Sequence, residues 1–337
     1  MTAKAKRAPT RAKMKRAAKP TPVVAAPSTV LVLRTCAAEM TAHGGFVWPE
    51  SGPIEAPDWS PSAECGHGLH GLLWGEGDGA LLDWSSDARW LVVEVNAGET
   101  LDLDGKVKFR RGVVAHCGDR LSATTYLVEH GAAGRAIVGG TATAGDRGTA
   151  TVGGGGTATA GDRGTAMAGH RGTATAGDGG TAIAGHSGIA TAGDGGTATA
   201  GDGGTATAGD SGTATAGDGG TATAGHRGLA TAGVSGTATV GGVGTATAGA
   251  GGTATAGYGG TATAGYRGTA TAGDVGTATA GYGGTAMAGD SGEIRIRWWD
   301  QHGNRYRLAV GYVGEGGIEA GKQYRVDGQG VIVAVAP

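Results

Sequence analysis

The sequence predicts a mainly β protein whose central part is an octapeptide-repeat β-solenoid with two octets per coil. Residues 141–292 consist of nineteen consecutive octets of the pattern T-A-T-A-G-x-x-G, without insertion. A fixed short period of this kind is typical of solenoids and repeat arrays. Gly accounts for 73 of the 337 residues and aromatic residues for only 5%, so an ordinary apolar core cannot run through the whole chain.

Each octet is interpreted as one strand and one turn. T-A-T-A alternates with the period of a β-strand, which puts Thr on one face and Ala on the other. Glycines at the fifth and eighth positions of every octet bracket two variable residues, as a tight turn with positive φ angles would require. Because a strand and a turn only reverse the chain, two octets close one coil. Nineteen octets then give a rod of roughly 45 Å.

The substitutions within the repeats indicate which face points inward. Ala at the second position never changes, and Ala at the fourth changes only to Val, as expected inside a thin core. Thr is replaced by larger residues, so we expect Ala inside and Thr outside. The alternative is that ladders of Thr fill the solenoid interior, because all five residues that replace Thr are apolar. The replacements are Met167, Ile183, Ile189, Leu229 and Met287.

Residues 16 apart should stack along the edges of the coils. One edge would carry a ladder of acids, namely Asp146, Asp162, Asp178, Asp194 and Asp210. This ladder could bind cations, or each Asp could cap the amides of its own turn. We favour capping, because the array lacks the calcium-binding nonapeptide pattern. On the other edge Tyr266 should stack over Tyr282.

The chain is predicted to have four parts. Residues 1–28 form a disordered basic Ala/Lys/Pro tail, 29–132 a small β-rich (α+β) globular domain of unknown function, 133–292 the solenoid, and 293–337 a β-hairpin C-terminal cap. Trp298 and Trp299 in the cap are expected to cover the last coil, since an open end exposes unpaired strand edges. The N-terminal domain would cover the first coil.

The tail carries eight Lys and Arg between residues 4 and 19 and no acid. Such a segment contacts nucleic acid or another anionic surface through charge, or it only solubilises the chain. The second interpretation is favoured, because no aromatic residue is present for base stacking.

The location expected from the sequence is the cytoplasm. No stretch approaches the roughly 20 apolar residues of a membrane span, and no apolar run follows the basic residues as in a secretory signal. The three cysteines suit a reducing compartment.

Two side-chain groups in the N-terminal domain are weak site candidates. Cys65, His67 and His70 in ECGHGLHG (64–71) have metal-ligand side chains, with His116 and Cys117 as completions. Zinc sites usually need four ligands in recognisable pairs, so we expect no metal and no cofactor. Arg34 and Glu94 are a remote hypothesis for an ADP-ribosyltransferase-like cleft. No catalytic residue is assigned, and no enzyme activity is expected.

Two octets, TATAGYGG and TATAGYRG (253–268), resemble the A-G-Y-G-S-T-x-T-A repeats of bacterial ice nucleation proteins. The resemblance implies a β-solenoid whose outward Thr rows order water into an ice-like layer. Here Gly replaces the Ser before Thr-x-Thr, only three turns carry Tyr, and the array is short for a nucleator. The candidate ice- or water-binding residues are Thr197, Thr199, Thr205, Thr207, Thr213, Thr215, Thr253, Thr255, Thr261 and Thr263.

The whole layout resembles uncharacterised bacterial and phage proteins that join a small domain of unknown function to short Ala/Thr/Gly repeats. The segments that carry this resemblance are GGFVWP (44–49), ECGHGLHG (64–71) and WLVVEV (90–95). We therefore expect a non-enzymatic structural or binding rod of unknown ligand, with ice or ordered water as the alternative and self-association as a further expectation. A low-complexity chain that never folds is the remaining alternative.

Overall fold

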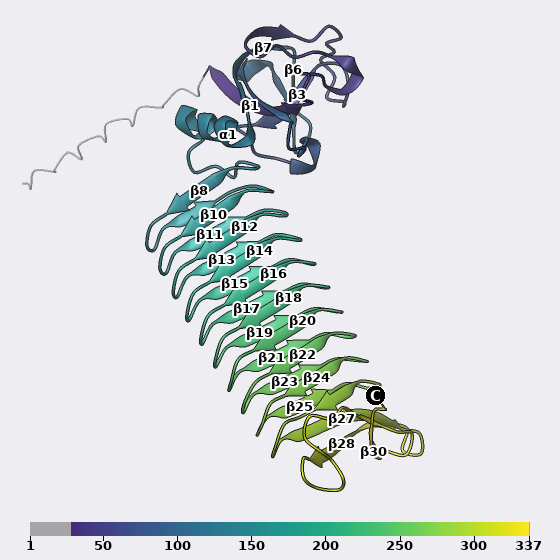
Figure 1. Cartoon of the computed structure of the whole chain (residues 1–337). Helices are drawn as coiled ribbons and strands as arrows, with labels where there is room; N and C mark the ends of the chain where they lie inside the picture. Colours follow the sequence, from purple (N-terminus) through teal and green to yellow (C-terminus); the bar gives the residue numbers. More distant parts are fainter. Residues whose placement is uncertain (1–27, 337) are drawn as a thin grey trace, which may run out of the picture.

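The computed structural model describes residues 28–336 and shows three parts in a row (Figure 1): an N-terminal domain, a long solenoid and a C-terminal cap. Residues 1–27 lie outside the described residues, and with them the predicted tail and its anionic partners. Within the described part, no helix is both long and apolar enough to span a membrane.

The N-terminal domain is built on a seven-stranded antiparallel sheet with the strand order β2-β7-β4-β1-β3-β6-β5. The sequence predicted strands here from short alternating apolar runs. The strands are β1 (Thr29–Cys36), β2 (Gly52–Glu55), β3 (Leu69–Leu73), β4 (Arg89–Asn96), β5 (Thr100–Asp102), β6 (Val107–Phe109) and β7 (Arg111–Gly118). The helical elements are η1 (His43–Gly45), η2 (Gly79–Leu81), η3 (Ala97–Glu99), α1 (Arg120–Leu127) and η4 (Val128–Ala132).

Each face of this sheet carries a buried apolar cluster. One face packs Val32 and Val93 with Trp48 and Phe109. The opposite face packs other residues of the same strands against α1 and the segment that leads into the solenoid. The helix begins at Asp119, whose side chain accepts a hydrogen bond from the Ser122 amide and caps the first turn.

The octets form two parallel sheets, which we call the odd-octet and even-octet sheets. The odd-octet sheet contains β8 (Thr141–Ala144), β10 (Thr157–Ala160), β12 (Thr173–Ala176), β14 (Ile189–Ala192), β16 (Thr205–Ala208), β18 (Thr221–Ala224), β20 (Thr237–Val240), β22 (Thr253–Ala256), β24 (Thr269–Ala272) and β26 (Thr285–Met287). The even-octet sheet contains β9 (Thr149–Thr151), β11 (Thr165–Ala168), β13 (Thr181–Ala184), β15 (Thr197–Ala200), β17 (Thr213–Ala216), β19 (Leu229–Ala232), β21 (Thr245–Ala248), β23 (Thr261–Ala264) and β25 (Thr277–Ala280).

The register confirms the coil of two octets. Each strand pairs in parallel with the strand two octets further on, so that Thr205 lies beside Thr221 and Ala206 beside Ala222. The mainly β fold with a solenoid at its centre is therefore as predicted.

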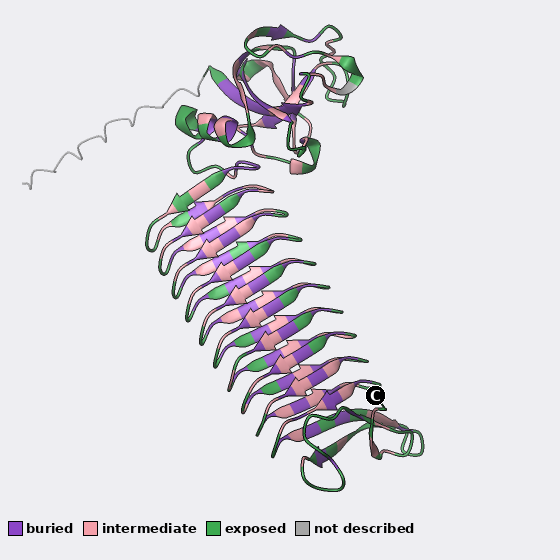
Figure 2. Cartoon of the chain, viewed as in Figure 1, coloured by how far each residue is buried: buried purple, intermediate pink, exposed green. Residues whose placement is uncertain are grey.

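Alanine forms the solenoid interior, as the substitution pattern predicted. The second-position alanines from Ala158 to Ala286 are all 0% exposed, and they belong to one continuous cluster. Thr side chains lie on the outer surfaces, where first and third positions are exposed or half-buried (Figure 2). The two sheets therefore pack through methyl groups, which explains why only Val is accepted in place of Ala.

The turn chemistry differs from the prediction. Positive φ angles fall at the seventh position, where Arg, Ser and Val occur as well as Gly, for example Arg147 at 59° and Ser187 at 55°. The invariant glycines at positions five and eight adopt no such angles. They are required by close packing: a Cβ on Gly196 would lie 2.8 Å from the Ala192 Cβ and 2.9 Å from the carbonyl oxygen of Gly180 in the preceding coil.

The cap ends both sheets by reversing the strand direction. Strand β27 (Glu293–Asp300) continues the even-octet sheet in parallel, and β28 (Arg305–Tyr312) pairs with it antiparallel. On the odd-octet sheet, β29 (Tyr324–Val326) pairs antiparallel with β26, followed by β30 (Ile332–Ala334).

The side chains that close the alanine core at this end are Ile294, Ile296, Ile318 and Tyr324. Trp298 and Trp299 lie beyond them in β27 and are half-buried. Trp298 packs on Gly330, and Trp299 meets the Tyr306 ring edge-on with centroids 4.9 Å apart. The two tryptophans thus support the cap strands, while the isoleucines extend the core.

At the other end, the N-terminal domain meets the first coil along one edge. The Gly153 amide donates to the Ile137 carbonyl (2.9 Å), and the Gly139 amide donates to the Gly154 carbonyl (2.8 Å). Strand β8 pairs with β10, and among residues 28–336 no strand pairs with its other side. Thr141 and Thr143 are exposed, so the domain covers only part of the first coil.

Candidate functional site

The candidate Thr residues are divided between the two outer faces of the solenoid. Thr205, Thr207, Thr253 and Thr255 lie on the odd-octet sheet. The other six candidates lie on the even-octet sheet, namely Thr197, Thr199, Thr213, Thr215, Thr261 and Thr263. No single flat surface can therefore use all ten residues.

The odd-octet face carries the longer unbroken array. Both Thr positions are filled in five consecutive coils, from Thr205 and Thr207 in β16 to Thr269 and Thr271 in β24. On the even-octet face Leu229 interrupts the first-position row, and at most three consecutive coils carry both residues. Sequence reasoning missed this difference because it counted octets without assigning them to faces.

The spacing of the hydroxyl groups on this face is set by the backbone. Thr side chains two residues apart are about 6.7 Å apart along a strand, and neighbouring coils are about 4.8 Å apart. Five coils therefore present a two-row grid about 19 Å long. Neighbouring hydroxyls can also contact one another, as between Thr285 and Thr269 at 3.3 Å. Such a grid offers regularly placed hydrogen-bonding hydroxyls and methyl groups on one outer face.

Parallel pairing and the turns hold this grid rigidly. In every coil the amide of the first strand residue donates to the carbonyl of the glycine that precedes the neighbouring strand, as from Thr221 to Gly204 at 2.9 Å. The strand amides thus bond each coil to the coil before, whereas the amide at the seventh position bonds it to the coil after, as from Arg163 to the Asp178 carbonyl at 2.8 Å. The Thr spacing consequently cannot vary independently from coil to coil.

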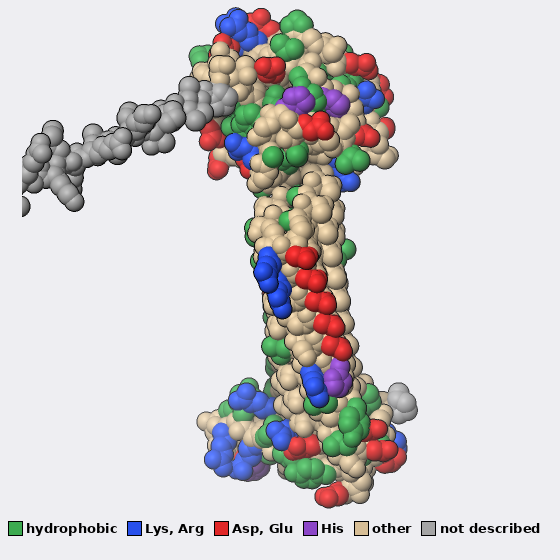
Figure 3. Space-filling model, turned by 90° about the vertical axis from the view of Figure 1, so that its left-hand side faces the viewer, with side chains coloured by type: hydrophobic (Ala, Val, Ile, Leu, Met, Phe, Trp, Pro, Cys, Tyr) green, Lys and Arg blue, Asp and Glu red, His purple; other side chains and the backbone are tan. Residues whose placement is uncertain are grey.

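Acidic side chains form a row along one edge of the solenoid (Figure 3), and their hydrogen bonds link successive coils. The Oδ1 atom of each Asp accepts a hydrogen bond from the amide 16 residues further on, at 3.2 Å for Asp162 onto Asp146 and 2.8 Å for Asp210 onto Asp194. Each Asp therefore caps the next coil and not its own turn, which corrects the expectation. The last bond of the row, from the His226 amide to Asp210, has a length of 2.8 Å.

Aromatic residues stack on the other edge. Tyr266 lies over Tyr282 as predicted, with ring centroids 6.0 Å apart. His170 and His186 stack on the same edge at 5.3 Å.

The weak metal candidates do not converge. The His67 Nδ1 atom lies 3.4 Å from an Asp58 oxygen, whereas the exposed Cys65 thiol contacts the Lys106 amine at 3.0 Å. The Lys106 hydrogen bond and charge lower the pKa of Cys65. Burial, together with the cations Lys106, Arg34 and Lys108, lowers the pKa of His70 to about 4. Among residues 28–336, no cluster of three His, Cys, Asp or Glu could hold a metal.

Arg34 and Glu94 do not share a cleft. Arg34 is opposite Leu91 in the register of β1 and β4, whereas Glu94 is opposite Leu31. Because side chains alternate across a strand, the two residues point to opposite faces of the sheet. Arg34 is half-buried, donates a hydrogen bond to the His70 carbonyl at 3.0 Å, and lies 4.4 Å over the Trp48 ring.

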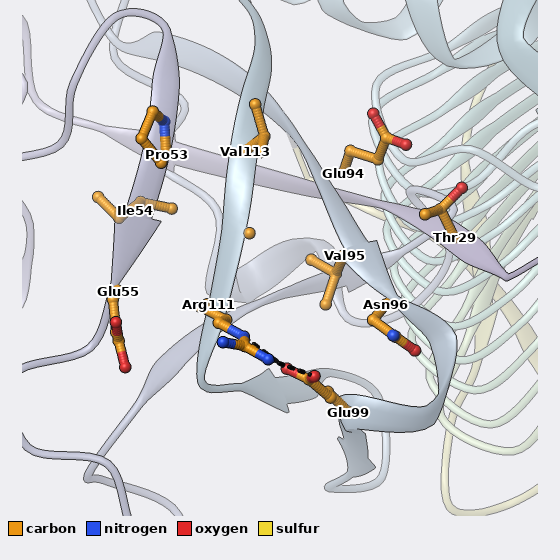
Figure 4. A pocket seen from close by; sticks show the side chains of 11 residues that line it. Thr29, Pro53, Ile54, Glu55, Glu94, Val95, Asn96, Glu99, Arg111 and Val113 are labelled. Atoms are coloured by element: carbon orange, nitrogen blue, oxygen red, sulfur yellow. Dashed lines mark hydrogen bonds and ion pairs between the residues drawn. The ribbon is translucent and has the colours of Figure 1, made fainter.

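Glu94 instead borders a shallow hollow of about 590 Å³ at the edge of the domain (Figure 4). Pro53 and Val113 are neighbours of Glu94 across β2, β7 and β4. Arg111 is engaged by Glu99 in an ion pair of 3.0 Å. The guanidinium is thus already neutralised by a carboxylate of the same hollow, and the remaining lining is mixed polar and apolar.

Together these features define a β-solenoid repeat protein with outward Thr rows and an attached domain. Residues 30–129 match a family described as a domain of unknown function, DUF7666. The resemblance to ice nucleation repeats is also confirmed. The chain is 44% identical over 103 residues to ice nucleation protein InaU of Pantoea ananas, covering 30% of this chain and 10% of that protein.

Two further relatives show the same pattern. An ice nucleation protein of Pseudomonas syringae is 46% identical over 99 residues, covering 29% of this chain and 9% of that protein. One from Xanthomonas campestris pv. translucens is 47% identical over 100 residues, covering 29% and 6%. The chain thus spans a tenth or less of the length of these relatives. No solved structure shows a significant match to the chain.

Proposed function

We propose that the solenoid is a non-enzymatic rod that binds ice or ordered water through the Thr rows of its odd-octet sheet. The observation that carries the proposal is the unbroken array of Thr pairs over five coils, from β16 to β24. The similarity to ice nucleation proteins supports it. The remaining Thr rows serve mainly as a soluble outer surface.

The physical basis is a match of spacing and rigidity. A rigid grid of about 6.7 by 4.8 Å is close to the repeat of some ice faces, so waters held by the hydroxyls and around the methyl groups can join the ice lattice. Because the backbone fixes the grid before binding, little conformational entropy is lost when ice is bound. The short array favours modest binding and slowed ice recrystallisation.

The proposal is tested by placing the same charge on each face in turn. Thr223→Lys with Thr239→Lys modifies the centre of the proposed face. The matched control, Thr215→Lys with Thr231→Lys, adds the same charges to the even-octet face of adjacent coils. The full-length proteins are compared in an ice-recrystallisation assay, with circular dichroism as the test of folding.

We expect the first pair to abolish inhibition and the control pair to retain it. Equal activity of both folded variants would contradict the assignment of the face. No effect on ice by the folded unmodified chain would leave the rod as a structural spacer and move its binding function to the domain of residues 30–129.

We also propose a cytoplasmic location. Cys36, Cys65 and Cys117 are all free thiols, as in proteins of reducing compartments. Cell fractionation with thiol labelling before lysis tests this, and recovery of the protein at the cell surface would contradict it.

A further inference from the structure

Three sulfur-bearing side chains meet at one end of the N-terminal sheet. Cys36 ends β1 and Cys117 lies near the end of β7, with β4 between them. Cys36 is opposite Arg89 and Cys117 opposite Leu91, which places both thiols on the same face. The Sδ atom of Met40 lies 3.9 Å from the Sγ atom of each cysteine.

The backbone of Met40 is held in a strained conformation at this position. Met40 has a φ of 62°, a left-handed conformation that is uncommon for residues other than glycine. Its amide donates to the Ala37 carbonyl (2.9 Å), and its carbonyl accepts from the Trp48 amide (2.8 Å). Strained residues of this kind concentrate at functional sites. Here the strained residue is the one whose sulfur lies between two thiols.

We propose that Cys36, Met40 and Cys117 form a binding site for a single soft monovalent cation, Cu(I). Thiolate and thioether ligands select Cu(I) over harder cations. In a trigonal site with metal–sulfur bonds of about 2.3 Å, as in zinc–thiolate sites, neighbouring sulfurs lie about 4.0 Å apart. Two of the three sulfur–sulfur distances already have nearly this length.

Charge and burial fit such a complex. Cu(I) with two thiolates carries one negative charge, and the Arg89 Nη2 atom lies 3.6 Å from the Cys117 sulfur. Arg34 lies two positions before Cys36 on the same face of β1. Cys36 and Met40 are buried, whereas Cys117 is half-buried, which leaves one ligand accessible for entry of the metal.

Binding exchanges protons for metal without any redox step. Each Cys S–H bond is replaced by a sulfur–copper bond, two protons pass to solvent, and copper stays Cu(I).

A disulfide and a zinc site fit less well. The cysteines lie on strands separated by β4 and are offset by two residues along it, so the strand spacing puts their Cα atoms at least about 9–10 Å apart, beyond the roughly 7 Å that a disulfide spans. Zinc prefers four ligands, and among residues 28–336 no three His, Cys, Asp or Glu side chains are placed to hold a metal ion. A thioether as the third ligand is a feature of soft-metal sites.

The test is an anaerobic titration of the reduced full-length chain with Cu(I) in the presence of a chromophoric Cu(I) chelator. The unmodified chain should take one Cu(I). Cys65→Ser is the matched control, because Cys65 is the exposed cysteine outside the cluster. Cys36→Ser should lose the tight site. Met40→Leu, which keeps an apolar side chain of similar size, should weaken it at least about tenfold, since even indirect partners of a metal affect affinity that much.

A second readout keeps the result independent of folding. Copper X-ray absorption should show three sulfur neighbours, and in selenomethionine-labelled protein one of them should become selenium. The proposal is overturned if folded Met40→Leu binds as tightly as the unmodified chain with no selenium neighbour, or if Cys65→Ser is the variant that loses copper.

Discussion

At the residue scale, different positions of each turn meet different requirements: one adopts a left-handed conformation and two pack closely against the preceding coil. In every turn except that of Val243, the seventh residue adopts the left-handed conformation, whether it is Arg, Ser, Val or Gly. The fifth and eighth residues are glycine because the preceding coil leaves no room for a Cβ. The invariant glycines were attributed to φ angles on the basis of general turn chemistry. The free variation at position seven was the signal that could have corrected this, together with the close coil spacing.

Val275 is the most strained residue of these turns. It is β-branched, has a φ of 58° and is 57% exposed, so it gains little from packing. Val275→Gly should therefore raise the free energy of unfolding by about 1–2 kcal/mol. The midpoint of thermal unfolding, followed by circular dichroism, measures the change.

The neighbouring residue provides the opposite control. A Cβ on Gly276 would lie 2.8 Å from the carbonyl oxygens of Gly260 and Gly273. Gly276→Ala should therefore lower the midpoint, by the roughly 1–3 kcal/mol typical of overpacking. A lower midpoint for Val275→Gly would refute the assignment of strain to position seven.

His70 should make the N-terminal domain sensitive to acid. Burial and nearby cations hold its pKa at about 4 in the folded chain, below the ordinary value of about 6.5. Between these values the unfolded chain binds a proton that the folded chain does not, so His70 favours folding above pH 6.5 and this contribution is lost as the pH falls toward 4.

The measurement is urea unfolding at several pH values, followed by Trp fluorescence. The free energy of unfolding should fall with decreasing pH between 6.5 and 4, and the slope should be shallower in His70→Gln. Parallel pH profiles for the two proteins would be incompatible with a depressed pKa of His70.

At the element scale, the cap protects the end of both solenoid sheets. Residues Ile294 and Ile296 continue the alanine stack. Antiparallel pairing ends the even-octet sheet at β28 and the odd-octet sheet at β29 and β30. Arg305 and Arg307 are exposed on β28, and charged side chains on an outer strand discourage further strand addition.

Removal of residues 293–337 should therefore expose two parallel edges and produce insoluble or fibrous material. Sedimentation and light scattering of the truncated chain measure this. The matched control is Trp299→Ala in the full-length chain, which removes the contact with Tyr306 but leaves the isoleucines and the antiparallel strands. A soluble, folded monomer after truncation would disprove the capping role.

At the scale of the whole molecule, the sequence pattern predicted contacts between neighbouring repeats, but not contacts between residues far apart in the N-terminal domain. The 16-residue coil, the alanine interior and the Tyr266–Tyr282 stack follow from periodicity, because neighbours in a solenoid lie at a fixed separation in sequence. The sulfur cluster could not be found in this way. Cys36 and Cys117 are separated by most of the N-terminal domain, and their meeting depends on a strand order that alternation does not encode.

The division of the Thr candidates has a similar cause. Thr197 and Thr205 begin consecutive octets but lie on opposite sheets, whereas Thr205 and Thr221 are two octets apart and lie side by side on one sheet. The functional surface is therefore defined by alternate octets. Replacements such as Ile189 and Leu229 affect only the face on which they occur.

Binding of ice by the odd-octet face can be observed as adsorption of the protein to a single ice crystal. Fluorescently labelled full-length protein is presented to a growing ice hemisphere, beside the Thr223→Lys, Thr239→Lys variant. We expect fluorescence restricted to particular ice planes for the unmodified chain and none for the variant. Exclusion of both folded proteins from the ice, to the same degree as an inert protein, would contradict this expectation.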